Sequence, residues 1–140
     1  MKLKGDVGTL EVRVLKRSNS ETEDYWDANW LESEIGINVA GFIALYRTNL
    51  RVDDLQRFYI DLTSLQANNL REVEFITMEE GLYLLCELYV DGNIRCKGKA
   101  TNDTGNSLDF KIRTDLVTLD IFISDLRTTL QLYPLIGSVE

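Results

Sequence analysis

The chain has 140 residues, 44% of them hydrophobic, and its 15 Lys and Arg against 23 Asp and Glu give a net charge of −8. This length suits a single domain spanning 1–140, and the composition is that of a globular protein. The negative charge argues against nucleic acid or an anionic membrane as a partner, and no apolar run is long enough to span a bilayer.

The chain contains no histidine, which excludes Ser-His-Asp and Cys-His catalytic systems. Its two cysteines, Cys86 and Cys96, are too few for a thiolate zinc site. Residues 1–6 lack the apolar stretch of a signal peptide. We therefore expect a cytoplasmic protein with no cofactor, in which both cysteines are buried as reduced thiols.

The first half of the chain predicts strands and then a helix. Residues 9–14 alternate apolar and polar, as in a half-buried strand, and a longer strand pattern covers 31–46. The apolar face changes near Ala40-Gly41, which predicts either one bent strand or two short ones in a strongly curved sheet. Apolar residues recur at steps of three and four over 52–68, the spacing of an amphipathic helix.

The second half predicts four more strands and a second helix. The strands are expected at 70–78, 82–90, 94–100 and 108–113. The helix is expected over 115–132, with Thr114 as its N-cap and an end at Tyr133-Pro134. The short tail after the proline is expected to pack against the sheet, and no internal repeat is visible in the sequence.

The Asp91-Gly92 pair marks a hairpin whose register can be derived. A two-residue loop would place basic residues on the apolar face of the partner strand. One more loop residue, with Gly92 in the left-handed conformation, keeps apolar opposite apolar and sets Cys86 opposite Cys96. A cross-strand disulfide is then geometrically conceivable, although packed thiols suit a reducing compartment.

These patterns together predict the α+β class. We expect a curved, mostly antiparallel sheet of about six to seven strands packed with two helices, near 52–68 and 115–132, because hairpin spacing favours antiparallel pairing.

Residues 24–31, the aromatic segment, contain both tryptophans, a tyrosine, two carboxylates and an amide. No Lys or Arg occurs between Arg17 and Arg47. The same interval carries six acids: Glu21, Glu23, Asp24, Asp27, Glu32 and Glu34. The aromatic segment therefore lies within a stretch of one charge sign.

Two interpretations of the aromatic segment remain open on sequence grounds. Trp26 and Trp30 can be core anchors, stacked on one face of a short helical turn that Asp24 or Asp27 caps. Alternatively, aromatics ringed by polar groups form the centre of a binding surface. That surface would comprise Tyr25, Trp26, Asp27, Asn29 and Trp30 with the flanking acids.

Other chemistry has weaker support. Asp27, Asn29 and Glu32 could offer oxygens to Ca²⁺, but their spacing does not match an EF-hand loop. Paired carboxylates can catalyse hydrolysis, but nothing in the sequence sets one pair against a defined pocket. We therefore predict a protein that is not an enzyme.

The run Asp24-Tyr25-Trp26-Asp27-Ala28-Asn29-Trp30-Leu31 resembles the DYWDGNWL signature of small bacterial proteins of the WapI family of immunity proteins. Ala28 stands where glycine is commoner. Phe42, the helical run 55–58 and Tyr133-Pro134 extend the resemblance over most of the chain.

The resemblance implies an antitoxin that binds the toxin domain of a polymorphic or contact-dependent toxin, often a nuclease acting on RNA, and implies no catalytic residues. On this interpretation the six acids steer a basic toxin domain, while Tyr25, Trp26 and Trp30 anchor it. The alternative is a structural or housekeeping protein that forms a homodimer through a free sheet edge.

Overall fold

The computed structural model describes residues 1–139 and contains two four-stranded antiparallel sheets. The first sheet has the order β1 (Lys2–Gly5), β2 (Gly8–Arg17), β3 (Trp30–Val39) and β4 (Phe42–Arg51), and α2 (Val52–Gln66) follows it. The second has the order β5 (Glu72–Phe75), β6 (Leu82–Leu88), β7 (Asn93–Thr101) and β8 (Ser107–Asp115), followed by α3 (Leu116–Leu132). A short helix, α1 (Tyr25–Ala28), lies between β2 and β3.

The predicted α+β class and mostly antiparallel pairing are confirmed, and both long helices occur where periodicity predicts them. About six to seven strands in one curved sheet were expected from the sequence, whereas the described residues form eight strands in two sheets. The unpredicted β1 has only four residues, of which Leu3 alone is buried, and this is too short for a period-two pattern. β5 is also shorter than the expected strand at 70–78.

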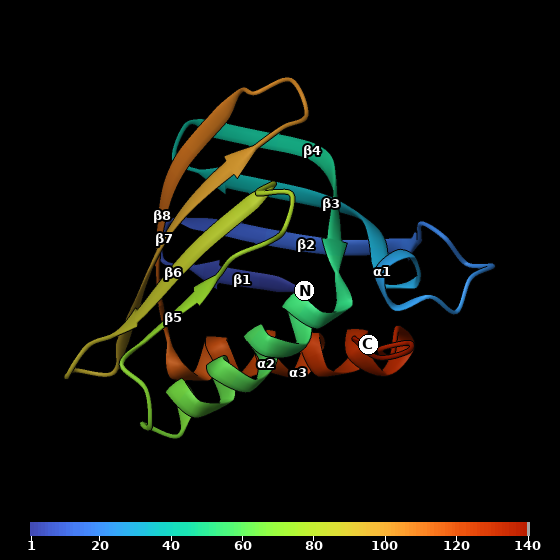
Figure 1. Ribbon diagram of the computed structural model, residues 1–140. Helices are drawn as coiled ribbons and strands as arrows, with labels where there is room; N and C mark the ends of the chain where they lie inside the picture. The colour runs from blue at the N-terminus through green and yellow to red at the C-terminus, as the bar shows by residue number, and fades with distance from the viewer. Residues whose placement is uncertain (140) are drawn as a thin grey trace.

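The two halves of the chain share one architecture, because each consists of a four-stranded meander followed by a helix. In Figure 1, α2 and α3 lie side by side beneath the sheets, and the strands of the second sheet cross those of the first at a steep angle. This repeat is not visible in the sequence, because the architecture needs only a compatible apolar pattern and not similar residues.

One apolar core extends across both sheets and both long helices. Phe58 of α2 packs against Phe75 of β5 and Phe122 of α3, with ring centroids 4.8 and 6.1 Å apart. The sheets meet where β1 approaches β8, since the amide of Asp6 donates to the carbonyl of Arg113 at 3.0 Å. α2 and α3 cover the apolar faces, so the opposite faces of both sheets remain accessible to partners.

The expected bend near Ala40-Gly41 is a full chain reversal. Val39 pairs with Phe42, which leaves Ala40 and Gly41 as a two-residue turn between two ten-residue strands. Gly41 has φ +91°, a conformation that side chains disfavour. The apolar residues on both faces after Gly41 thus have a simple cause. β4 is an edge strand, and its exposed positions carry large apolar side chains.

The β6–β7 register is confirmed. Cys86 pairs with Cys96 and Glu87 with Arg95, and Gly92 adopts φ +85°. The two sulfurs lie 3.2 Å apart as free, buried thiols. The hydrogen bond shared with Cys96, together with burial, raises the pKa of the Cys86 thiol well above its ordinary value.

The predicted cap of the second long helix is off by one residue. Asp115 is the N-cap of α3 and accepts a hydrogen bond from the amide of Thr118 at 2.8 Å. Thr114 is buried and donates instead to the carbonyl of Lys4 at 2.9 Å, which helps to join the two sheets. No helix among residues 1–139 has both the length and the apolar character to cross a membrane.

Asp54 in the first turn of α2 is a buried carboxyl, and its Oδ2 atom has no hydrogen-bond partner in the described chain. Burial, aided by the neighbouring charge of Asp53, raises the pKa of Asp54. A raised folded-state pKa favours the protonated acid, so stability from this group is present at low pH and is lost as pH rises through that pKa. We therefore expect Asp54→Asn to raise the thermal midpoint at pH 7, with a gain that shrinks toward pH 4.

The measurement is thermal unfolding of both proteins from pH 4 to pH 8. Asp61→Asn, on the same helix, is the matched control and is expected to change the midpoint little at any pH. A lower midpoint for Asp54→Asn at pH 7 would contradict the prediction.

Candidate functional site

The aromatic segment begins with α1, a single capped helical turn. The carboxylate of Asp24 accepts hydrogen bonds from the amides of Trp26 and Asp27, each at 3.2 Å, and so caps the turn as the sequence allowed. Four residues are far fewer than the roughly 12 needed for an isolated helix to be stable. Tertiary contacts must therefore hold α1 in place.

Those contacts converge on Arg51, the last residue of β4, which is only 1% exposed. Its Nε donates to Asp53 at 2.8 Å, and its terminal nitrogens donate to the carbonyls of Trp26 at 2.8 Å and Tyr25 at 3.2 Å. The guanidinium also lies 5.2, 5.3 and 5.0 Å from the ring centroids of Tyr25, Trp26 and Trp30. These distances suit cation–π contacts, so one buried cation organises all three aromatics of the segment.

Asn29 ties the C-terminal tail to the same point. Its side-chain amide donates to the carbonyls of Tyr25 and Ile136, each at 2.8 Å, and its oxygen accepts from the amide of Ile136 at 3.0 Å. Asn29 is fully buried. The tail therefore packs against α1, whereas packing against the sheet was expected from the sequence. Its contact with the sheet is a hydrogen bond from Arg17 of β2 to the carbonyl of Pro134.

Tyr25 is buried in the same cluster, and its hydroxyl donates to Asp53 at 2.7 Å. This hydrogen bond is the main cause that raises the pKa of Tyr25. Asp53 thus accepts from both Tyr25 and Arg51, which fixes the tyrosine ring against the cation. Trp30 is half-buried, and its ring also lies against the Arg51 guanidinium.

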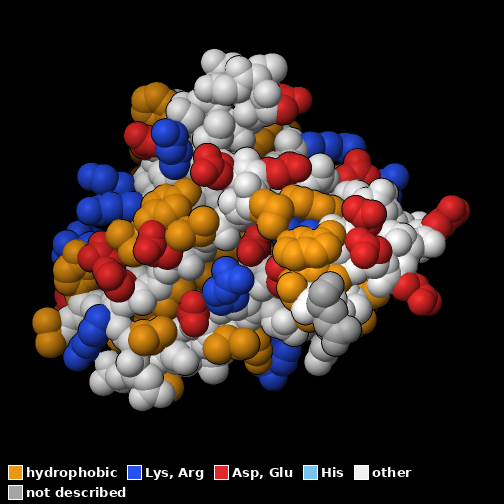
Figure 2. All heavy atoms as spheres, viewed as in Figure 1, with side chains coloured by type: hydrophobic (Ala, Val, Ile, Leu, Met, Phe, Trp, Pro, Cys, Tyr) orange, Lys and Arg blue, Asp and Glu red, His pale blue; other side chains and the backbone are white. Residues whose placement is uncertain are grey.

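Trp26 differs from its neighbours because 48% of its side chain is exposed. Its ring stands edge-on to Tyr25, with centroids 5.0 Å apart and an interplanar angle of 87°. Four exposed acids surround α1 in the sequence, and we name them with Trp26 the acidic aromatic surface: Glu21, Glu23, Asp24, Trp26 and Asp27. Figure 2 shows acidic side chains beside an apolar patch over the region where Figure 1 draws α1.

Glu32 and Glu34 lie apart from that surface, on the outer face of the first sheet. Glu32 pairs with Lys16 at 3.4 Å and Glu34 with Arg13 at 3.5 Å, each across the β2–β3 ladder. The ten predicted binding residues therefore fall into three groups. Five form the acidic aromatic surface, three pack around Arg51 beneath it, and two lie on the sheet face.

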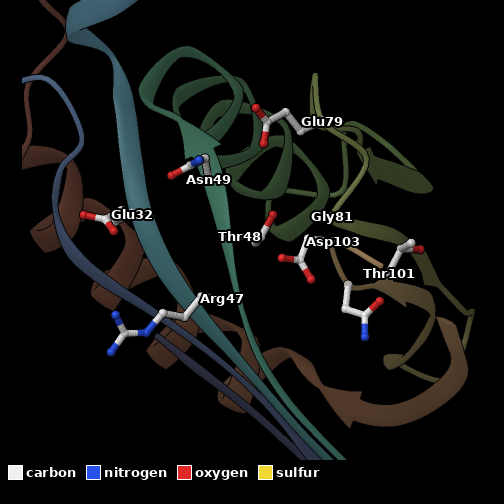
Figure 3. Close-up of a pocket in the computed structure, with 9 residues that line it drawn as sticks. Glu32, Arg47, Thr48, Asn49, Glu79, Gly81, Thr101 and Asp103 are labelled. Carbon is white, nitrogen blue, oxygen red and sulfur yellow. The ribbon is translucent and has the colours of Figure 1, made fainter. Parts of the chain in front are cut away.

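Glu32 also borders an open pocket of about 270 Å³ between the first sheet and two loops of the second half. Figure 3 shows Arg47, Thr48 and Asn49 of β4 on one side, and Glu79, Gly81 and Asp103 on the other. The pocket brings three carboxylates near one arginine. Among residues 1–139 no group of three His, Cys, Asp or Glu side chains is arranged to hold a metal ion.

Basic side chains gather on the outer face of β7 and β8. Arg95 lies opposite Arg113 and Lys97 opposite Lys111, and all four are exposed. Among the described residues none of the four has an ion-pair partner. These four cations therefore form a basic patch on the second sheet, whereas the acids of the acidic aromatic surface lie around α1.

Arg51 is the residue that sequence reasoning missed. The local sequence gives little indication of its role. Arg51 directly follows an apolar strand position, and Asp53 and Asp54 follow at the start of a predicted helix. Nothing in that pattern indicates that the guanidinium turns inward to meet carbonyls 25 and 26 positions earlier in the chain.

The fold and the capped aromatic segment define a small α+β protein with exposed acids around a capped aromatic turn. The WapI-like immunity protein family matches residues 2–134, and the chain belongs to that family. The predicted resemblance is thereby confirmed. Comparison with curated proteins finds no match.

Solved structures with a similar fold exist. The crystal structures of trypanosoma bruciei MRP1/MRP2 align with a TM-score of 0.51 and 10% identity, covering 89% of this chain and 74% of theirs. A guide-RNA-binding protein complex bound to its RNA aligns with a TM-score of 0.48 and 10% identity, covering 87% of this chain and 89% of that one. At 10% identity, the similarity to the MRP1/MRP2 structures concerns the fold alone. The similarity to the guide-RNA-binding complex is too weak to add to that conclusion.

Proposed function

We propose that the protein neutralises a cognate toxin domain by direct binding through its acidic aromatic surface, and that it acts by occlusion and not by catalysis. The observation that carries the proposal is the half-exposed side chain of Trp26. Arg51 holds this tryptophan in place, and exposed carboxylates lie close to it in the sequence. Membership of an immunity protein family supports a toxin as the partner.

In this proposal the residues of the aromatic segment have two different roles. Trp26 and the exposed acids contact the toxin. Tyr25, Asn29 and Trp30 hold the surface in shape, because their hydrogen bonds and ring contacts are directed inward at Arg51 and the tail. A pre-organised surface loses little conformational entropy on binding, and so retains more of its contact energy as affinity.

The charge of the surface favours a cationic toxin, of which a nuclease is the best example. A nuclease must hold phosphates with basic groups, and an acidic surface competes for the same groups. The net charge of −8 adds a long-range attraction that speeds encounter.

The direct test is capture of the partner. The tagged chain is expressed in its source cells, and a basic toxin domain is expected to co-purify with it in stoichiometric amount. The same domain, produced in a heterologous host, should arrest growth unless this chain is co-expressed. Recovery of the chain alone, from cells shown to produce the toxin, would contradict the proposal.

Neutralising the acids should slow association. We expect Glu21→Gln, Glu23→Gln and Asp27→Asn together to lower the on-rate for the captured toxin domain by about 10-fold or more at low salt, and to flatten its salt dependence. Asp24 is left unchanged because its carboxylate caps α1. Stopped-flow mixing over a series of salt concentrations measures both effects.

The basic face supplies the matched control. Lys97→Gln with Lys111→Gln removes both charges of one of the two opposed basic pairs on the second sheet. Because these cations lie away from α1, their loss should leave the on-rate equal or slightly higher. Because the two variants change the net charge in opposite directions, an equal loss of on-rate in both could not arise from charge at all and would contradict the assignment of the acids.

A further inference from the structure

The edge of the first sheet carries an apolar surface that the acidic aromatic surface does not include. β4 is the last strand in the order β1-β2-β3-β4, so it is an edge strand of that sheet. Phe42, Ile43 and Leu45 at its start are 62%, 78% and 69% exposed. A long edge strand with exposed apolar side chains is a site for strand pairing unless charge or a bulge protects it. Residues 42–46 carry no charge, and the β3–β4 ladder has no register shift.

The β3–β4 turn determines which backbone groups are free. Val39 and Phe42 flank a two-residue turn, so they exchange both hydrogen bonds, and even-numbered residues of β4 bond to β3. The amides and carbonyls of Ile43, Leu45 and Arg47 therefore point away from the sheet. No group among residues 1–139 bonds to them outside the strand ladder.

We propose that β4 pairs antiparallel with β4 of a second copy of this chain, about a two-fold axis at Ala44. In this register Ile43 of each copy lies opposite Leu45 of the other, and their free backbone groups bond to each other. The four side chains then meet on the outer face of the joined sheets.

The remaining positions of the register also match. Ala44 faces its own copy at a non-hydrogen-bonded position, where Cα atoms approach to about 4.5 Å and a small side chain fits. Phe42 lies opposite Tyr46 of the second copy, so the exposed ring gains an aromatic neighbour. Arg47, the charge closest to the axis, lies opposite Gly41, so the two cations are not opposed.

Neighbouring registers are poorer. An axis at Leu45 would place each Arg47 against Ile43 of the other copy, and an axis at Ile43 would leave Leu45 opposite Gly41. With the axis at Ala44, the turn at Ala40-Gly41 of the second copy lies opposite Arg47 and Thr48, in the stretch of β4 that borders the open pocket.

The pairing leaves the toxin-binding surface free. Ala44 is seven positions from Arg51, which is roughly 23 Å along an extended strand. The acidic aromatic surface lies at the Arg51 end, because α1 contacts that residue. Each copy could therefore hold its own partner, and the dimer does not rest on the proposed function.

The test is sedimentation velocity of the full chain over a concentration series. We expect a concentration-dependent dimer of twice the 16.0 kDa chain mass. Ile43→Lys with Leu45→Lys should give a monomer at every concentration, because four ammonium groups would then meet across the axis. Ile60→Lys, at a 58% exposed position of α2, is the matched control and should dimerise like the unchanged chain.

A crosslink tests the register itself. Ala44→Cys should form a disulfide-linked dimer under mild oxidation, since opposed Cα atoms at about 4.5 Å fall within disulfide range. Ala40→Cys, which lies opposite Thr48 in this register, should not. The buried Cys86 and Cys96 do not interfere. A monomeric unchanged chain at all concentrations, a dimer that survives the double lysine variant, or equal crosslinking at both positions would overturn the proposal.

Discussion

Arg51→Met is expected to lower the free energy of unfolding by about 3–5 kcal/mol, the cost of removing one partner from a buried ion pair. Met fills similar space but leaves Asp53 without its cation and the carbonyls of Tyr25 and Trp26 without their donor. Since total stability is typically about 5–15 kcal/mol, this is a large fraction of it.

Urea unfolding followed by tryptophan fluorescence is the measurement. The chain has two tryptophans, and both contact Arg51, so their emission should shift to the red even before global unfolding. Arg51→Lys should also be clearly destabilising, because an ammonium cannot donate in the planar fork that reaches three acceptors.

Arg47→Met is the matched control. Arg47 is exposed on the same strand, and its replacement should change stability by less than about 0.5 kcal/mol. Equal losses for the two methionine variants would show that Arg51 is not the organising residue of the segment.

Trp26→Ala is expected to weaken toxin binding by about 30-fold or more, the 2 kcal/mol or greater effect of a hot-spot residue. The loss should appear mainly as faster dissociation, because an anchor acts after encounter while charges act before it. Surface plasmon resonance against the captured toxin domain separates the two rates.

The unfolding midpoint of Trp26→Ala must be measured beside its affinity, since the ring also contacts Arg51. Val90→Ala, a fully exposed apolar residue at the β6–β7 turn, is the control and should leave binding unchanged. If Trp26→Ala loses stability but binds at the original affinity, the tryptophan is a core anchor and the proposed contact surface is wrong.

Much of the fold could be predicted from the sequence, because it follows from short-range patterns. Steps of three and four residues located α2 and α3, and the need to keep apolar opposite apolar gave the Cys86–Cys96 register. The aromatic run was sufficient to predict the family. Each of these signals lies within about 20 consecutive residues, where side-chain direction depends on the local backbone alone.

The division into two sheets and the construction of the site depended on the tertiary structure. Arg51 reaches a carbonyl 25 residues away, and Asn29 reaches the tail across 107 residues. Burial of an arginine or an asparagine is unfavourable until such distant acceptors are in place, so no local pattern can indicate it. The sequence by itself determined the two long helices, most of the strands, the family and the acidic character of the chain. Only the tertiary structure decided that Tyr25 and Asn29 face inward, that Trp26 faces outward, and that β4 has a free edge.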